Sequence, residues 1–539
     1  MDQAMNRRSF LGLGALGALG TAAGLMGISK AYADEATVST SAAGVSGVNA
    51  IERIEGSEVK ECDVAIVGAG AAGLMAALKL AEAGKHVVVI EKAPGAGFSN
   101  FSMCGGPTAC ETKIQEAENA TVTLDQIFTY MNDFSRGSVN SALLRNCLAH
   151  TGEAIDSMSD LGISLVLKED TYGVGFRGRH MFEAGGDERV SPIVEAIEAQ
   201  GGEFLYGCAG EKVIMEDGVA IGVQTSLGID VMAPAVVVCT GGFLGNEAMQ
   251  LDRYNTKVFA LGSLLSDGAG INMVLDAGGA WDRNFAVLGN ECGAVSVATT
   301  SPFTPEWKNT NEHLGYWLFG GLYTDTAGER YIDEARVAQF PLAVGGEALI
   351  RAGRSYVIMD SDYYEGIQEQ GVFGYLGAPE SWISGPVADY YVPSAENAEA
   401  HLQEAIDQGW GIKADNLAEI AEFFDLPSLE ATVERYNGYC EDGVDVDFGK
   451  DAAFLTPIKT APFYAFEYVP SAWGTNGGVK VDSHLRAMDK DNKAIPGLYV
   501  AGVDQGSVYS VPYYTNEGSS VGLALGSGVY VAKEIAEVE

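Results

Sequence analysis

The sequence predicts an α/β protein in which a Rossmann-like dinucleotide-binding domain carries an inserted α+β capping domain. Two observations predict this fold. Residues 63–92 contain an apolar strand, a glycine-rich turn, an apolar helix and a second apolar strand, in that order. From about residue 285 to residue 471 aromatic and acidic residues increase and the alternation of strands and helices is lost, after which it returns. We therefore expect one domain to be interrupted by another.

The first strand, turn and helix carry the pattern G-x-G-x-x-G at Gly68, Gly70 and Gly73. In this pattern one glycine permits the tight turn, one lets the backbone approach a pyrophosphate, and one allows close helix–strand packing. The helix N-terminus offers N–H groups and a positive dipole end to phosphates. Glu91 ends the second strand, where it can accept hydrogen bonds from a ribose. The segment predicts a dinucleotide site; a purely structural glycine-rich turn is the alternative.

Residues 1–33 predict a twin-arginine signal peptide. Arg7 and Arg8 precede an apolar stretch at residues 10–28, and residues 31–33 read A-x-A, as at a cleavage site. We expect export by the twin-arginine route to a periplasmic or other extracytoplasmic location, free or membrane-associated; a retained membrane anchor is the alternative. Residues 34–58, rich in Ala, Ser, Thr, Gly and Val, predict a linker. No later run of 18 apolar residues follows, so we expect the mature chain not to span a membrane.

The net charge of −40 argues against a nucleic-acid-binding protein, because no basic field is available to neutralise phosphates. It also disfavours long-range attraction of anionic substrates. None of the eight cysteines forms C-x-x-C, and the six histidines are scattered. Haem attachment, an iron–sulfur cluster and a metal site are therefore not expected.

We place the dinucleotide-binding domain at residues 59–285 and 471–539, and the capping domain at residues 286–470. A Gly/Ser-rich loop at residues 94–110 is expected to lie over the cofactor. Asp217-Gly218 and Gly228 mark hairpin turns. Helices are expected within residues 124–163 and at residues 191–200, 396–408, 417–424, 429–439 and 521–536.

Five blocks together resemble the fumarate reductase/succinate dehydrogenase flavoprotein superfamily. They are the segment 63–92, VVVCTGGF (236–243), SDGAGINM (266–273), GERYIDE (328–334) and IPGLYVAG (495–502). The resemblance implies an FAD-binding domain with a cap, and a substrate held between the cap and the isoalloxazine ring. Members with covalent FAD use a histidine in the loop after the fingerprint, and residues 95–106 contain none, which implies non-covalent FAD. The implied FAD-binding residues are Gly68, Gly70, Ala72, Gly73, Glu91, Lys92, Gly105, Gly106, Thr240, Gly241, Gly242, Asp267, Gly502, Asp504, Ser519 and Val521.

The chain also departs from the fumarate reductases of that superfamily. Gly474 stands where they have a histidine, and Ala338 stands where they have an arginine proton donor. A dicarboxylate needs paired cationic donors. We therefore expect a substrate other than fumarate.

The segment Y-T-N-E-G-S-S-V-G, which starts at Tyr514, resembles a block of the 3-ketosteroid dehydrogenases of the same superfamily. The resemblance implies that the hydroxyl of Tyr514 and the N–H of Gly518 hold a carbonyl oxygen, as an oxyanion hole does. Arg336 or a nearby tyrosine is the candidate general acid. The alternatives are a buried tyrosine packed on the flavin ring and an arginine engaged in a surface salt bridge.

The expected function is that of an exported FAD-dependent oxidoreductase. It would act on CH–CH groups and reduce a C=C bond conjugated to a carbonyl, in an enone, enoate or steroid-like substrate, with hydride from flavin N5. Electrons would come from an external donor, such as a cytochrome or a quinol dehydrogenase in anaerobic respiration. Two alternatives remain open: a 3-ketosteroid-type dehydrogenase working in the oxidative direction, and a non-catalytic FAD electron relay.

Overall fold

The computed structural model describes residues 58–170, 174–183, 185–283, 286–289, 293–294, 321–339, 344, 346–376, 396 and 398–537. These residues belong to one compact unit, Ile54–Glu539. The expected signal peptide and all of the expected linker except Glu58 lie outside the described residues, as does Cys292.

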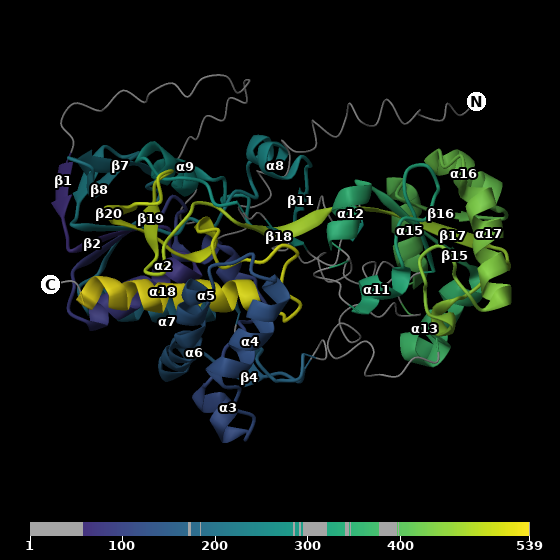
Figure 1. Cartoon of the computed structure of the whole chain (residues 1–539), viewed down its shortest axis with the longest axis horizontal. Helices are drawn as coiled ribbons and strands as arrows, with labels where there is room; N and C mark the ends of the chain where they lie inside the picture. The colour runs from purple at the N-terminus through teal and green to yellow at the C-terminus, as the bar shows by residue number, and fades with distance from the viewer. Residues whose placement is uncertain are drawn as a thin grey trace. The chain divides into compact units, whose positions relative to one another are not determined.

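A six-stranded sheet forms the centre of the dinucleotide-binding domain (Figure 1). Its order is β19 (Arg486–Met488), β20 (Ala494–Val500), β10 (Ala235–Val238), β2 (Val64–Val67), β3 (Val87–Ile90) and β6 (Glu203–Leu205). The strands from β20 to β6 are parallel, and β19 is antiparallel to β20. All residues of β2, β3 and β10 are buried. A strand that is covered on both faces requires a continuous apolar run, which is why these strands could be predicted.

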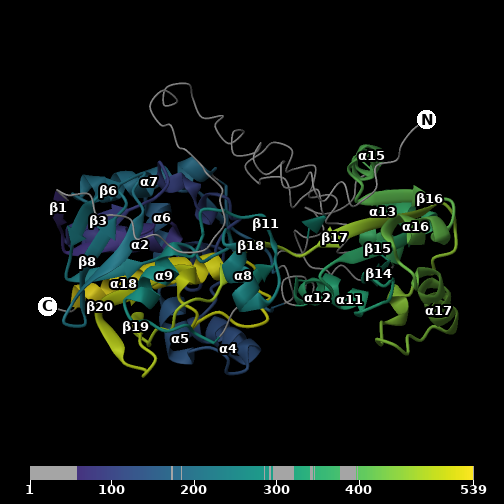
Figure 2. The ribbon, with the colours of Figure 1, turned by 90° about the horizontal axis from the view of Figure 1, so that it is seen from above.

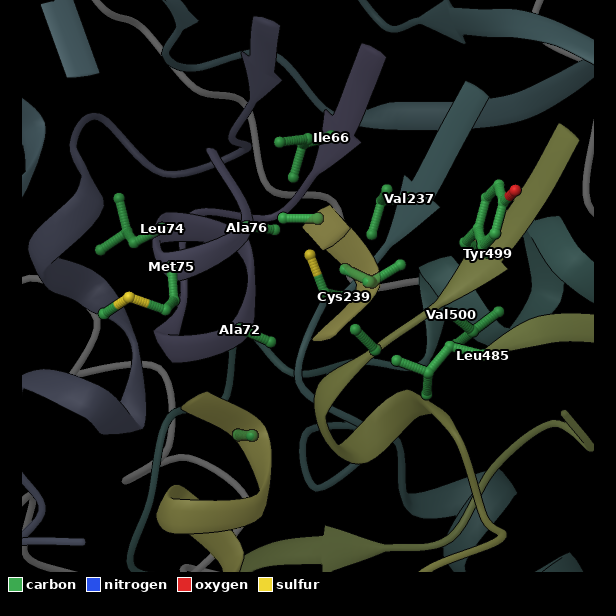
Figure 3. Close-up of a cluster of buried hydrophobic side chains, with 14 of the residues drawn as sticks. Ile66, Ala72, Leu74, Met75, Ala76, Val237, Cys239, Leu485, Tyr499 and Val500 are labelled. Carbon is green, nitrogen blue, oxygen red and sulfur yellow. The ribbon is translucent and has the colours of Figure 1, made fainter. Parts of the chain in front are cut away.

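Two helices pack together against this sheet. The helix α2 (Ala71–Glu82) follows the fingerprint, and α18 (Ser519–Glu537) lies beside it (Figure 1). Glycine makes the close approach possible: a Cβ on Gly528 would lie 2.4 Å from the carbonyl oxygen of Ala72. Figure 3 shows apolar side chains of the core that helix and sheet share, among them Ile66 of β2, Met75 of α2 and Val237 of β10. The sequence prediction of strand, turn, helix and strand is confirmed.

This domain contains a second, four-stranded sheet. Its order is β1 (Glu58–Glu61), β9 (Ile229–Met232), β8 (Val219–Thr225) and β7 (Gly210–Glu216). The sheet consists of two hairpins, β7–β8 and β8–β9, with β1 parallel to β9 at one edge. The turn between β7 and β8 has positive φ at both Asp217 (48°) and Gly218 (82°), as a two-residue hairpin turn requires. The predicted turn is confirmed.

The remaining helices of the domain mostly agree with prediction. The region 124–163 holds α4 (Leu124–Ser135), α5 (Ser141–Ala149) and α6 (Thr151–Asp160). The helix α7 (Gly186–Ala199) begins at Gly186 rather than at the expected residue 191, because the carboxylate of Glu188 caps the backbone N–H of Gly185. Further short elements are α3 (Lys113–Ala117), β4 (Leu165–Leu167), β5 (His180–Phe182), α8 (Glu247–Tyr254), β11 (Phe259–Ala260) and α9 (Ala269–Asp276). Three 3-10 turns also occur: η1 (Ala96–Phe98), η2 (Asn100–Ser102) and η7 (Gly502–Asp504).

The inserted lobe contains a mixed arrangement of helices around an antiparallel sheet, in agreement with the α+β prediction. The strands are β13 (Gly293–Ala294), β14 (Leu322–Thr324), β15 (Ser355–Asp360), β16 (Gly411–Ala414) and β17 (Phe463–Val469). Figure 2 shows β15 beside β17. The helices are α11 (Glu334–Gln339), α12 (Gly346–Ala352), α13 (Ser361–Leu376), α15 (Ala398–Gln408), α16 (Leu417–Phe424) and α17 (Leu429–Asp442).

Side chains of β15 alternate between two apolar clusters. Tyr356 and Ile358 pack with residues of α16 and α17, whereas Val357 and Met359 pack with residues of α13 on the opposite face. A strand places successive side chains on opposite faces, so β15 serves both clusters. The lobe thus has its own core.

The chain passes between the two parts through paired strands. The strand β18 (Ser471–Asn476) is antiparallel to β12 (Ala286–Gly289) and parallel to β11. Within the described residues, no helix has both the length and the apolar character needed to cross a membrane.

Candidate active site

A cavity of about 440 Å³ opens at the fingerprint of the dinucleotide-binding domain. Its lining comes from the fingerprint turn, the loop after β3, the end of β10, β5, β18 and the start of α18. Eleven of the residues expected to bind FAD line it: Gly68, Gly70, Ala72, Glu91, Lys92, Gly105, Gly106, Thr240, Gly241, Gly502 and Val521.

The three fingerprint glycines differ in their surroundings. Gly68 has φ +105°, and a Cβ there would lie 2.5 Å from the carbonyl oxygen of Cys239. At Gly70 a Cβ would meet nothing closer than the Ser99 Cβ at 3.8 Å, so the backbone is open towards the cavity. Gly73 does not line the cavity; a Cβ there would lie 1.9 Å from the Gly68 carbonyl oxygen. Gly73 therefore acts through packing.

Glu91 fixes the fingerprint turn from the neighbouring strand. One carboxylate oxygen accepts the N–H of Ala69 at 2.8 Å, and the other accepts the N–H of Ala93 at 2.8 Å. Each carboxylate oxygen has a second acceptor position. Glu91 can thus hold the turn and still bind a ribose hydroxyl from the cavity wall.

Four other residues that we expected to bind FAD do not line the cavity in the described part of the chain: Gly242, Asp267, Asp504 and Ser519. Asp504 is buried in η7, where it accepts the N–H groups of Thr240 and Gly242, the latter at 2.7 Å. Burial raises the pKa of Asp504, although these hydrogen bonds oppose the change. Asp267 instead pairs with Lys92 at 3.0 Å, and the hydroxyl of Ser519 donates to a main-chain carbonyl. These residues shape the cavity rather than line it.

The loop after β3 is held over the cavity by one amide that sequence reasoning missed. The side chain of Asn100 donates to the carbonyl oxygen of Trp473 at 2.6 Å and accepts the N–H of Ser263 at 2.7 Å. Asn100, Trp473 and Ser263 all line the cavity. No local sequence pattern predicts these hydrogen bonds, because Asn100, Ser263 and Trp473 lie far apart in the sequence.

A second group of residues missed from the sequence forms what we call the Arg179 wall: Gly105, Arg179, Met181, Tyr513 and Glu517. Arg179 and Glu517 form an ion pair, and each side chain is 16% exposed. A Cβ on Gly105 would lie 2.7 Å from a terminal nitrogen of Arg179 and 3.1 Å from the Met181 methyl carbon. Gly105 belongs to the loop that we expect to lie over the cofactor, and the wall lines the same cavity as the fingerprint glycines Gly68 and Gly70.

The two neighbouring tyrosines point to different places. Tyr513 lines the cavity, and its hydroxyl accepts the N–H of Ser520 at 2.6 Å; burial raises its pKa, so it is neutral. Tyr514 does not line the cavity: its hydroxyl donates to the Val508 carbonyl at 2.7 Å, and its ring packs on Phe134. The structure therefore does not place Tyr514 as a carbonyl ligand.

The other two expected catalytic residues, Gly518 and Arg336, also lie in different places. Gly518 lines the cavity, with φ +78° and a Cβ position only 2.4 Å from the Gly106 carbonyl oxygen. Arg336 is exposed at the start of α11 and is absent from the described lining. The structure thus brings Gly518 to the site and does not bring Arg336 there.

The residues present fit a bound FAD. The first turn of α2 has no side-chain cap, so its N–H groups remain available beside the open backbone of Gly70. Two buried polar atoms of lining residues, the Asn476 amide nitrogen and the Ser99 hydroxyl, have no hydrogen-bond partner among the residues that the structure describes. Buried polar groups are normally paired, which a polar ligand would achieve here.

Comparison with known proteins agrees with this geometry. A family model described as "FAD binding domain" matches residues 63–521. A vinyl phenol reductase of Lactiplantibacillus plantarum is 27% identical over 492 residues, which cover 86% of this chain and 94% of that protein. A 3-oxosteroid 1-dehydrogenase of Mycolicibacterium smegmatis is 24% identical over 596 residues, which cover 88% of this chain and 97% of that protein.

A solved structure, the open conformation of a flavocytochrome c3 fumarate reductase, has a similar fold. Its TM-score is 0.63 at 20% identity, and the match covers 89% of this chain and 78% of that one. Together these findings confirm the resemblance to the fumarate reductase/succinate dehydrogenase flavoprotein superfamily, and FAD as the cofactor.

Proposed function

Since the chain belongs to the FAD binding domain family and is an FAD-dependent oxidoreductase acting on CH–CH groups, we propose that it reduces a C=C bond conjugated to a carbonyl in a small neutral substrate. The observation that carries the proposal is the Arg179 wall. Among the described residues of this wall the cation, Arg179, is paired with Glu517, and Met181 and Tyr513 supply apolar surface.

The wall has the groups that such a reduction needs. When bound, FAD supplies the hydride. The Arg179 guanidinium can donate a hydrogen bond to the oxygen on which negative charge develops, which is worth most in a water-poor site. Met181 and the buried ring of Tyr513 exclude water from that oxygen. A dicarboxylate would need further cations, because Glu517 already neutralises Arg179.

The relatives support the reduction of a C=C bond. The vinyl phenol reductase is named for a neutral alkene. The first test supplies the FAD-loaded protein with reduced viologen and offers enones, cinnamates, urocanate and fumarate in turn. We expect turnover of the neutral enones; turnover of fumarate alone would contradict the proposal.

Arg179 can be tested against a matched control. Arg179→Met should lower kcat/KM by about 10²-fold or more, the usual effect of losing one oxyanion donor. Arg177→Met should leave kcat/KM near the wild-type value, because Arg177 pairs with Glu118 at 2.8 Å and does not line the cavity. Flavin content per chain is measured for both variants. Equal activity of the two variants would remove Arg179 from the mechanism.

A second candidate function is the reverse reaction. The similarity to a 3-oxosteroid 1-dehydrogenase, which spans nearly all of that protein, favours it. Rapid reduction of the flavin by a saturated 3-ketosteroid, with no other electron donor present, would establish this candidate. A reduced flavin that only a partner protein reoxidises would instead point to an electron relay.

We also propose export by the twin-arginine route, with electrons delivered by a cytochrome or a quinol dehydrogenase. Arg7 and Arg8, followed by the apolar stretch and the A-x-A site, support the route. Replacing both arginines with lysine should retain the protein in the cytoplasm, as fractionation of cells would show. Equal export of the lysine variant would refute the route.

A further inference from the structure

We propose that the Arg179–Glu517 pair rejects carboxylates and accepts neutral polar groups. A carbonyl would bind through Arg179 alone, and a group that both donates and accepts a hydrogen bond, such as a phenol hydroxyl, would bind most tightly. This inference rests on the proposed function, because it assumes that the substrate's polar group meets the Arg179 wall.

Both members of the pair are accessible to a ligand. Arg179 and Glu517 line the cavity of about 440 Å³, and each side chain keeps 16% of its surface exposed. The guanidinium lies against Gly105, where any larger residue would collide with it. Arg179 and Glu517 therefore form part of the cavity wall beside the loop that contains Gly105, while the Oε2 atom of Glu517 is itself buried.

Thr108 fixes the backbone at Arg179 relative to the backbone at Glu517, and it does so without a ligand. It forms an antiparallel bridge with Arg179, and its hydroxyl donates to the carbonyl oxygen of Glu517. Its N–H donates to the carbonyl oxygen of Gly518 at 3.0 Å. Because one residue fixes both backbones, the donor and the acceptor are presented together, as a preorganised site requires.

The chemistry of the pair then decides what binds. Arginine can only donate hydrogen bonds, and an ionised glutamate can only accept them. A hydroxyl satisfies both, since its oxygen accepts from Arg179 while its proton goes to Glu517. An ether oxygen uses Arg179 alone. A carboxylate gains Arg179 but meets the negative charge of Glu517 in a site with little water to screen it.

The test measures binding rather than turnover. Oxidised FAD-loaded protein is titrated with 4-ethylphenol, 4-ethylanisole and 4-ethylbenzoate, and the flavin absorbance change gives each Kd. The three ligands share one apolar body and differ in the polar group. We expect the phenol to bind at least about tenfold more tightly than the ether, and the benzoate to bind most weakly.

Glu517→Gln removes the negative charge and keeps the shape of the side chain. Its affinity for 4-ethylbenzoate should rise at least about tenfold relative to the wild type. Glu118→Gln is the matched control, because it also removes an arginine's partner, that of Arg177, outside the cavity lining. The control should keep the wild-type order of the three ligands.

Arg179→Lys provides a second variant should Glu517→Gln lose its FAD. It retains the ion pair but lacks the fork of donors, so the phenol should bind several-fold more weakly while the benzoate stays rejected. Equal affinity of the wild type for phenol and benzoate, or no spectral response to any of the three ligands, would overturn the proposal. A protein that binds with the expected order but turns over no alkene would instead refute the proposed function alone.

Discussion

His180, at the start of β5, is a fully buried histidine that touches the cavity wall through its backbone. A Cβ on Gly106 would lie 1.8 Å from its carbonyl oxygen. One ring nitrogen donates to the Gly178 carbonyl at 3.0 Å, and the other accepts from the Thr112 hydroxyl at 2.9 Å. Burial lowers the pKa of His180 to about 4, although the hydrogen bond to Gly178 opposes the change. The neutral ring is therefore part of the folded structure.

This histidine predicts a loss of stability in acid. Between its ordinary pKa of about 6.5 and about 4, the unfolded chain binds a proton that the folded chain does not. The contribution of the neutral His180 to the free energy of unfolding is therefore complete above pH 6.5. It is lost as the pH falls, and the loss is on the order of 3 kcal/mol. His180→Asn should flatten the dependence of unfolding free energy on pH between 7 and 4.

At the scale of the element, the close packing of α2 depends on Gly73. Alanine normally stabilises a helix interior relative to glycine by about 1 kcal/mol. At Gly73 the added Cβ would lie 1.9 Å from the Gly68 carbonyl oxygen, so the helix must move away from the turn. We expect Gly73→Ala to cost about 3 kcal/mol, the upper end for overpacking, and to lower FAD occupancy. Chemical denaturation and the flavin content per chain measure the two effects.

The matched control is another helical glycine. Gly438 in α17 has open space where its Cβ would lie, so Gly438→Ala should be neutral or stabilising by up to about 1 kcal/mol. A similar destabilisation by both substitutions would show that the approach of α2 to the turn is not the cause.

Across the molecule, the described chain has one large apolar cluster in the dinucleotide-binding domain and further clusters in the inserted lobe, one of which also includes Leu261. A buried charge network stabilises the lobe. Arg330 donates to Glu334 at 2.8 and 2.9 Å and to Asp445 at 2.9 and 3.1 Å, while Lys450 lies 3.4 Å from Glu334. Burial alone would raise the pKa of Glu334, but Lys450 and Arg330 lower it overall.

Glu334→Gln should therefore destabilise the lobe by about 3–5 kcal/mol, because two buried cations would share one remaining carboxylate. Because the clusters are separate, we expect the melting temperature of the lobe to fall while FAD binding stays close to normal. Scanning calorimetry with and without added FAD measures both, since FAD should raise only the transition of the domain that binds it. A loss of FAD together with the lobe would contradict independent cores.

The local parts of this protein could be predicted from the sequence. The fingerprint, the buried strands β2, β3 and β10 and the turn at Asp217-Gly218 depend on residues that are neighbours in the chain. Glycine geometry and apolar runs act over a few residues, so their pattern is visible without the fold. These patterns predicted a dinucleotide site, and the resemblance of five blocks to the flavoprotein superfamily implied FAD and eleven of the residues that line the cavity.

Patterns along the chain thus indicate the cofactor and the elements that hold it, whereas contacts between distant segments select the side chains that line the cavity. Tyr513 and Tyr514 are adjacent, yet packing against Phe134 and a hydrogen bond to Val508 turn Tyr514 away from the cavity. Arg179 and Glu517 lie far apart in the chain and meet through the backbone contacts of Thr108. Such pairings depend on how distant segments fold together, and no local pattern records them.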